Sequence, residues 1–154
     1  MLDRRQLMMT GASALAALSA AGPALAQAQA PAAGEKTTQT SIVPARNQPL
    51  VDSASECIKL GETCLQHCYK TLATGDKSMA KCAETVRAML PMCEALESLA
   101  IQDSAHLKEL ATLCGKVCRD CEKACKVHQN HHEICKQCMQ SCAKCAEACE
   151  KFVA

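Results

Sequence analysis

The sequence predicts an all-α protein, an antiparallel up-down-up-down four-helix bundle with a core lined by cysteine. Fourteen of the 154 residues are cysteines, and most of them lie three, four or seven positions apart. Such spacing places the cysteines of each segment within an arc of about 80° on one helix face. From residue 50 onward the chain divides into helical segments of similar length, and their short connections put successive helices antiparallel. The cysteine faces therefore meet inside a bundle.

The first two helices are delimited by capping residues. Ser53 and Glu56 have the spacing of a capping box near the start of the first helix, which is expected over residues 50–73. Pro49 also suits a first helical turn. Gly75 ends that helix. Asp76 suits the N-cap of the second helix, which is expected to run to about residue 101.

The second half of the bundle follows the same pattern. Pro91 lies inside the second helix and removes one backbone hydrogen bond, so a kink is expected there. Asp103 suits the N-cap of the third helix, which is expected to end near Val127. Asn130 suits the start of a fourth helix that ends near Phe152.

The cysteines agree with an antiparallel register. Residues at one height of two antiparallel helices have a constant sum of residue numbers. This holds at three interfaces, for the pairs Cys57/Cys93 and Cys68/Cys82, Cys93/Cys114 and Cys82/Cys125, and Cys118/Cys142 and Cys125/Cys135. The register predicts three layers: Cys57, Cys93, Cys114, Cys145 and Cys149 at one end, Cys64, Cys118, Cys121, Cys138 and Cys142 in the middle, and Cys68, Cys82, Cys125 and Cys135 at the other end.

A core of thiols has three interpretations. Cysteine packs as a small hydrophobe, but fourteen cysteines beside one Phe, one Tyr and no Trp are far from ordinary core composition. A disulfide scaffold is typical of exported chains, yet neighbours on one helix would form strained bridges that hold no distant segments together. Disulfides between helices stay an alternative. Metal binding is favoured, because thiolates select Cu(I), Zn(II) or iron–sulfur clusters.

The number of thiols favours Cu(I) among these metals. Cu(I) accepts two or three thiolates, so a pair one helical turn apart can hold an ion. Zn(II) demands four ligands in a tetrahedron, which the layers could meet only a few times. The ferredoxin pattern ending in Cys-Pro does not occur in the sequence. A zinc or metallothionein-like buffer and a thiol-redox or iron–sulfur electron carrier stay as alternatives.

The two ends of the predicted bundle differ in chemistry. An apolar plug is expected from Leu96, Leu99, Leu107, Leu110, Phe152 and Val153. Weaker ligands are expected at the opposite end, from His67, Met79, His128, His131 and His132. Copper should enter at that end, because exposed thioether and imidazole bind Cu(I) more weakly than buried thiolate and offer intermediates. Met89 has the phase of Cys93, so the candidate ligands beyond the cysteines are Met79, Met89, His128 and His132.

Residues 1–26 have the features of a twin-arginine (Tat) signal peptide. Arg4 and Arg5 precede a mildly apolar stretch that is too weak for a transmembrane span, and Ala24-Leu25-Ala26 forms a cleavage signal. We expect cleavage after Ala26 and export in the folded state to a bacterial periplasm. Residues 27–49, rich in Ala, Gln, Thr and Pro, are expected to form a flexible lead-in to a bundle over residues 50–154.

The charge of the chain argues against several classes of function. The formal net charge is +1, and loss of Asp3, Arg4 and Arg5 with the signal peptide brings it to zero. Without a basic stripe, neither nucleic acid nor a membrane surface is an expected partner. The chain shows no catalytic triad, carboxylate pair or facial triad, so we expect storage rather than enzymatic catalysis.

The chain resembles the exported copper storage proteins. The resemblance is carried by the twin-arginine leader, the bundle of about 100 residues and the repeated pairs Cys64/Cys68, Cys114/Cys118, Cys118/Cys121, Cys121/Cys125, Cys135/Cys138, Cys138/Cys142, Cys142/Cys145 and Cys145/Cys149. It implies several Cu(I) ions per chain, entry past Met and His at an open end, homo-tetramers and delivery to a copper-requiring client enzyme. The second helix, with only two cysteines, departs from the family pattern, and the cluster His128, His131 and His132 need not match the family's usual gate.

Overall fold

The computed structural model describes residues 42–154. The predictions for residues 1–41, which include the signal peptide and most of the lead-in, lie outside the described residues. The domain boundaries proposed from the sequence therefore stay predictions.

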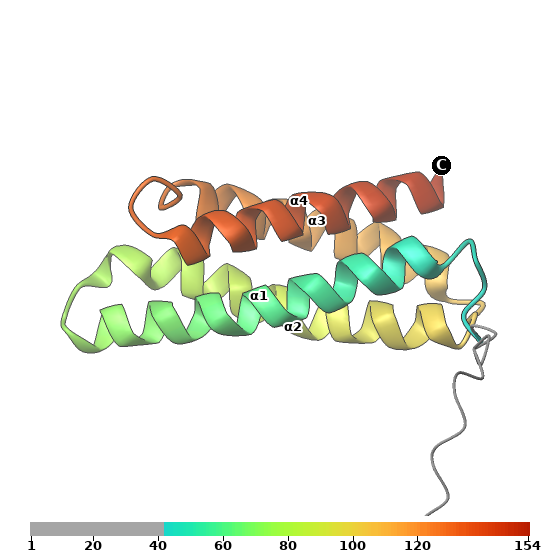
Figure 1. The fold of residues 1–154 in the computed structure, drawn as a ribbon, viewed down its shortest axis with the longest axis horizontal. Helices are drawn as coiled ribbons and strands as arrows, with labels where there is room; N and C mark the ends of the chain where they lie inside the picture. Colours follow the sequence, from blue (N-terminus) through green and yellow to red (C-terminus); the bar gives the residue numbers. More distant parts are fainter. Residues whose placement is uncertain (1–41) are drawn as a thin grey trace, which may run out of the picture. The chain divides into compact units, whose positions relative to one another are not determined.

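The described residues form the predicted all-α bundle without a strand. The elements are α1 (Gln48–Ala73), the short 3-10 helix η1 (Lys77–Met79), α2 (Ala80–Ile101), α3 (Leu107–Lys126) and α4 (Glu133–Val153). Each α-helix runs antiparallel to two neighbours, α1 to α2 and α4, and α3 to α2 and α4 (Figure 1). α2 continues through Pro91, and the kink predicted there stays a prediction.

The start of α1 confirms one prediction, Pro49 in the first turn, and corrects the other. The helix begins at Gln48 with Pro49 in its first turn, so Ser53 lies inside the helix rather than at its N-cap. The Ser53 hydroxyl donates to the Leu50 carbonyl, 3.2 Å away. The capping box at Ser53 and Glu56 is therefore wrong. Proline is well suited to a first helical turn because the amide it lacks would have no intrahelical partner there.

The other helix starts also differ from the predictions. Asp76 accepts a hydrogen bond from the Ser78 amide at 2.9 Å, but it caps η1, and the N-cap of α2 is Met79. Asp103 does not cap α3, which begins at Leu107, because its carboxylate accepts from Arg46 and Asn47 instead. Asn130 lies before the N-cap of α4, which is His132. Contacts with a distant segment thus prevail over local capping at Asp103.

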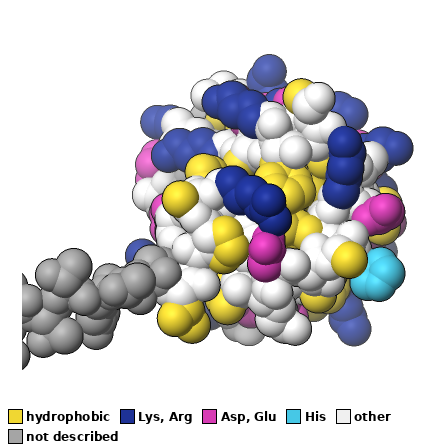
Figure 2. All heavy atoms as spheres, turned by 90° about the vertical axis from the view of Figure 1, so that its right-hand side faces the viewer, with side chains coloured by type: hydrophobic (Ala, Val, Ile, Leu, Met, Phe, Trp, Pro, Cys, Tyr) yellow, Lys and Arg dark blue, Asp and Glu magenta, His cyan; other side chains and the backbone are white. Residues whose placement is uncertain are grey.

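The end of the bundle opposite η1 is closed by apolar side chains. Leu50, Leu96 and Leu107 are buried there, and Phe152 packs half-buried against the same core. Figure 2 shows hydrophobic side chains gathered at the centre of this end, with Lys and Arg around them. The predicted plug is present, and Leu50 adds to it.

Two glycines allow helices to approach closely inside the bundle. A Cβ atom on Gly61 would lie 2.7 Å from Met89 Cε and 2.9 Å from Leu90 Cδ2. A Cβ atom on Gly115 would lie 3.2 Å from Cys149 Cβ. Gly61 thus leaves room for α2 side chains beside α1, and Gly115 lets α4 pack against α3.

Candidate metal centre

All fourteen cysteines lie inside the bundle as free thiols. Thirteen have no exposed surface, and Cys149 is 1% exposed. The alternative of disulfides between helices is not realised in this structure. Because each helix carries its cysteines on one face, four helices bring the thiols into one continuous core.

The sulfur atoms lie close enough to share metal ions. The shortest distance between two thiols is 3.4 Å, from Cys82 Sγ on α2 to Cys125 Sγ on α3. Cys93 Sγ is 3.7 Å from Cys118 Sγ, and Cys64 Sγ is 3.9 Å from Cys135 Sγ. Metal–thiolate bonds are about 2.3 Å long, so one ion can bind both sulfurs of such a pair.

Thirteen of the fourteen cysteines, all but Cys68, form five groups, and within each group the sulfur atoms lie within 4.8 Å of one another. The groups are Cys57/Cys93/Cys118/Cys145, Cys114/Cys145/Cys149, Cys121/Cys138/Cys142, Cys64/Cys125/Cys138 and Cys64/Cys82/Cys135. Three cysteines belong to two groups each. A metal ion in one group is therefore next to a ligand of another.

The grouping corrects the three layers expected from the register. Cys118 belongs with Cys57 and Cys93 instead of the middle layer, and Cys64 belongs with Cys82 and Cys135. The pairs expected between α1 and α2 and between α2 and α3 do meet, since Cys57 shares a group with Cys93 and the sulfur of Cys82 lies 3.4 Å from that of Cys125. Between α3 and α4, the expected pairs Cys118/Cys142 and Cys125/Cys135 share no group. A four-residue step along a helix moves a side chain by about 6 Å, so a small displacement changes which sulfurs meet.

At mid-height α1 and α2 contribute no thiol. Between Cys57 and Cys64, α1 has Gly61 on the cysteine face, and between Cys82 and Cys93, α2 has the buried Met89. The thioether of Met89 contacts the Cys93 thiol at 3.3 Å, as its helical phase predicted. Gly61 was not among the candidate residues, although its position four residues after Cys57 could have indicated it.

Hydrogen bonds between thiols shift their acidities in opposite directions. Hydrogen bonds with Cys118, then Cys142, lower the pKa of Cys57 to about 5 despite burial. A hydrogen bond to Cys114 raises the pKa of Cys93, and burial raises it further. The core thus combines thiolates with neighbouring protonated thiols that donate to them.

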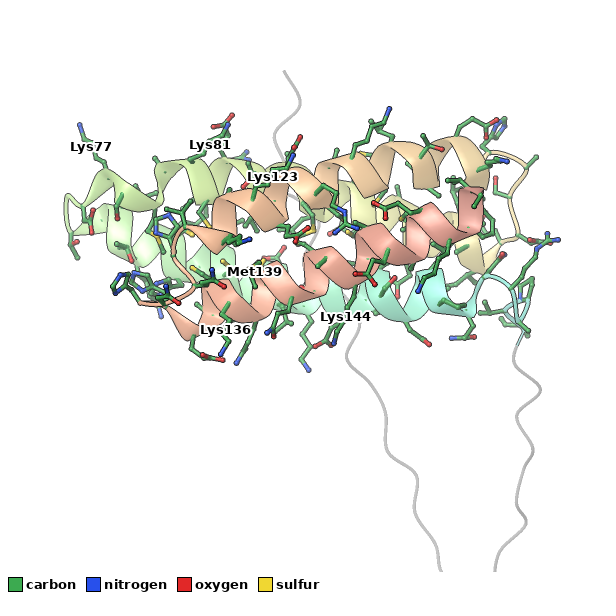
Figure 3. The ribbon with its side chains drawn as sticks, turned by 90° about the horizontal axis from the view of Figure 1, so that it is seen from above. Lys77, Lys81, Lys123, Lys136, Met139 and Lys144 are labelled. Atoms are coloured by element: carbon green, nitrogen blue, oxygen red, sulfur yellow. The ribbon has the colours of Figure 1, made fainter. Side chains whose placement is uncertain are left out.

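The core contains no buried cationic side chain among residues 42–154. Asn47 and Ser141 are the buried polar residues of that range, and neither carries charge. The lysines labelled in Figure 3 extend from the outside of the bundle. Charge on the thiolates must therefore be neutralised by protons or by bound metal ions.

The histidines cluster at the end that carries η1. His67 Nε2 on α1 lies 3.0 Å from Nδ1 of His132, the N-cap of α4. The ring of His128 lies 6.3 Å from that of His132, between centroids. These three are half-buried and His131 is exposed. The structure thus brings together His67, His128 and His132, as the sequence predicted.

Met79 differs from its predicted environment. It lies at the same end, but its side chain is fully buried rather than exposed at a rim. The 3-10 helix η1 turns this residue inward between α1 and α2. Met92 on α2 and Met139 on α4 are half-buried.

The fold and the thiol core define a class of protein, a helical bundle that binds soft metal ions in its interior. Comparison with known families identifies the particular one. The profile of the family described as copper storage protein matches residues 44–154. The chain belongs to the copper storage protein family.

Solved structures agree with this assignment at the level of the fold. The apo form of copper storage protein 3 from Bacillus subtilis is 24% identical, with a TM-score of 0.62 over 70% of this chain and 99% of that one. A Cu(I)-bound form of the copper storage protein BsCsp3 is 23% identical, with a TM-score of 0.64 over 71% of this chain and 99% of that one. A comparison with curated proteins found no match.

The family and the core confirm the prediction that this protein stores Cu(I). Its buried thiols supply five overlapping groups of soft ligands, which supports several Cu(I) ions per chain. The family is one of storage proteins. Within the described residues, no helix has the length and hydropathy needed to cross a membrane.

Proposed function

We propose that this protein is exported and holds Cu(I) ions along a tube of thiolates for later delivery to a copper-requiring enzyme. The observation that carries the proposal is the uncharged environment around five overlapping thiol groups. Each Cu(I) ion neutralises one thiolate, so a core without cationic side chains favours about one ion per thiolate. No catalytic role is proposed.

Zn(II) fits the same core less well. One group, Cys57/Cys93/Cys118/Cys145, has the four thiols that tetrahedral zinc requires, and the other four groups have three each. At the four-thiol site, one Zn(II) ion would neutralise two of the four thiolate charges and leave the other two uncompensated. The structure therefore favours a monovalent soft ion.

Anaerobic titration tests the storage function. Reduced protein is titrated with Cu(I) in the presence of a competing chelator, and the ions bound per chain are counted. We expect well above four ions per chain, with thiolate-to-copper absorption in the ultraviolet. Saturation at one or two ions would contradict storage. A parallel Zn(II) titration should saturate at fewer ions, because few groups offer four ligands.

The histidine end is the proposed entrance. Imidazole is a weaker ligand for Cu(I) than buried thiolate, and the His67–His132 pair lies beside the first cysteines of the core. The pair His67→Ala with His132→Ala should slow copper transfer from a small chelator and leave the final capacity unchanged. His106→Ala at the apolar end is the matched control. Equal transfer rates in both variants would contradict entry of copper at the histidine end.

Export and assembly are part of the proposal. Residues 1–26 carry Arg4 and Arg5 in a twin-arginine-like segment, and replacement of both by Lys should retain the protein in the cytoplasm. Cell fractionation with the unaltered chain as control measures this.

The resemblance to exported relatives supports a homo-tetramer. Light scattering of the mature protein should give four times the chain mass, and a monomer would contradict it.

A further inference from the structure

Four of the five thiol groups form two clusters. An outer cluster lies toward the histidines and contains the groups Cys64/Cys82/Cys135 and Cys64/Cys125/Cys138. An inner cluster lies toward the leucine end and contains the groups Cys57/Cys93/Cys118/Cys145 and Cys114/Cys145/Cys149. These two clusters share no cysteine.

One remaining group connects the clusters. It consists of Cys121 on α3 with Cys138 and Cys142 on α4. Cys138 is also a member of the outer cluster, and Cys142 Sγ lies 3.9 Å from Cys57 Sγ of the inner cluster. Cys121 Sγ lies 4.0 Å from Cys125 Sγ of the outer cluster. Cys121 and Cys142 therefore belong to neither cluster. The Cys121 sulfur lies beside the outer cluster, and the Cys142 sulfur lies beside the inner cluster.

The opposite wall of the core offers no alternative thiol at this height. There α1 has Gly61, and Met89 of α2 fills the space beside it, since a Cβ on Gly61 would collide with Met89 Cε. The Met89 sulfur lies 3.3 Å from the sulfur of Cys93, so it is next to the inner cluster and not between the two clusters. The apolar Val86 is also fully buried on α2. The thiol connection between the clusters therefore runs along α3 and α4.

Cu(I) moves between thiolates by exchanging ligands, and each exchange needs a new sulfur within reach before an old one leaves. Sulfurs about 4 Å apart satisfy this condition, because one ion can bind both. A longer gap would require a copper ion with too few ligands in an apolar interior, which is costly. The ligands at the narrowest part of the thiol path therefore control the rate of transfer.

We propose that Cys121 and Cys142 are transfer ligands, which pass copper from the outer cluster to the inner cluster. The inference rests on the proposed storage function and on entry at the histidine end. It assigns to these two cysteines a role different from that of the other thiols. It also predicts that the outer cluster fills before the inner one.

The test is a time course of copper loading in the variant Cys121→Ser with Cys142→Ser. Reduced protein receives Cu(I) from a Cu(I)–chelator complex without oxygen, and native mass spectrometry counts the ions bound per chain. The variant should load its outer cluster at the normal rate. Its second stage should be slower by about tenfold or more, the effect of at least one additional unfavourable ligand exchange. After long incubation its capacity should approach that of the unaltered protein, less the ions that two thiolates hold.

The matched control is Cys114→Ser with Cys149→Ser. This variant also loses two thiols, but they lie in the inner cluster and not on the path between the clusters. It should have reduced capacity and no slow stage. Circular dichroism checks that both variants are folded, and the corresponding alanine variants replace the serine variants if the buried hydroxyls destabilise the bundle.

Three results would each be decisive. Equal loading rates in the two variants would overturn the transfer role while leaving storage intact. A partly loaded crystal with copper in the inner cluster and none in the outer would overturn the direction of filling. That result would indicate entry through the groove of about 200 Å³ beside Cys149, between α3 and α4. Saturation of the unaltered protein at one or two ions would instead refute the storage function itself.

Discussion

At the scale of single residues, the acidity of the thiols decides how protons and copper compete. Cys68 and Cys135 lie toward the histidine end, and each accepts a hydrogen bond from Cys64. These bonds lower the pKa of Cys68 to about 4 and that of Cys135 to about 3. Both are therefore thiolates at neutral pH. The pKa of Cys64 is raised, so it stays protonated until copper displaces its proton.

Copper retention in acid should depend on these low-pKa ligands. Protons compete for each thiolate as the pH falls toward its pKa, so ligands with low pKa values retain Cu(I) at lower pH. The variant Cys68→Ser with Cys135→Ser should lose copper at a pH about one unit higher than the unaltered protein. The measurement is acid titration of loaded protein with a Cu(I) chelator.

The control for this titration replaces two cysteines whose pKa is raised. Cys138→Ser with Cys149→Ser also removes two thiols, and hydrogen bonds with Cys121 and Cys114, respectively, raise the pKa of these two. Their loss should lower the capacity with little change in the pH of release. A larger shift in the control than in the low-pKa variant would contradict the assignment.

At the scale of the elements, Asn47 fastens the start of α1 to the end of α2. Its side-chain amide donates to the Ala100 carbonyl and to the Asp103 carboxylate, each at 2.9 Å. Arg46 forms an ion pair with the same carboxylate at 2.7 Å. Both partners lower the pKa of Asp103, the Arg46 hydrogen bond most. Asp103 has a positive φ of 50°, and these contacts hold it in that conformation.

Removal of the Asn47 amide should destabilise the bundle. Asn47 is fully buried, so Asn47→Ala leaves the Ala100 carbonyl without this donor, at a cost of about 1–3 kcal/mol in the free energy of unfolding. Urea denaturation of the apo protein measures the change. The control is Gln48→Ala, which removes an exposed hydrogen bond to Asp52 and should change stability by less than about 0.5 kcal/mol. Equal effects of the two substitutions would show that Asn47 does not fasten the helices.

The leucine end should contribute stability and not copper binding. Leu96 has no exposed surface, so Leu96→Ala should cost about 2–5 kcal/mol through lost burial and a cavity. Leu113, on α3, is 51% exposed, and Leu113→Ala should cost much less. Urea denaturation compares the two, and Cu(I) titration should give both the capacity of the unaltered protein. A loss of capacity in Leu96→Ala would show that the plug also shapes the metal core.

At the scale of the whole molecule, the thiol core joins four helices whose remaining apolar contacts are concentrated at one end. The buried leucines and alanines lie mainly beyond the inner cluster, whereas between the ends cysteine replaces larger side chains. Cysteine is itself a small hydrophobe, so the apo bundle has a continuous buried core. Bound Cu(I) adds cross-links between helices to that core.

The apo protein should fold, and copper should raise its thermal stability. A ligand that binds only the folded state stabilises it by about 2.7 kcal/mol per site at a free concentration a hundred times the Kd. Several such sites should raise Tm by more than about 10 °C in a domain of this size. Circular dichroism at 222 nm, recorded during heating of apo and loaded protein, measures both helicity and Tm. An apo protein without helical signal would show that metal binding and folding are one process.

The sequence alone determined the helices, their order and the burial of their cysteines, because helical periodicity is a local property. Spacings of three, four, seven and eleven residues put the cysteines of each helix on a core-facing stripe, and all fourteen are buried. The same periodicity placed Met89 beside Cys93 and brought His67 to His132. The apolar plug followed from residues beyond the last cysteines.

The sequence register predicted the contacts of Cys82 with Cys125 and of Cys93 with Cys114, but only the tertiary structure decided how all the sulfurs group. The distance between thiols on different helices depends on the displacement of one helix along another, and this is set by side-chain packing across the interface. Cys118 therefore joins Cys57 and Cys93, contrary to the three expected layers. The burial of Met79 likewise depends on contacts between segments. Division of the thiols into two clusters joined by Cys121 and Cys142 is a property of the packed bundle, since no spacing within one helix specifies it.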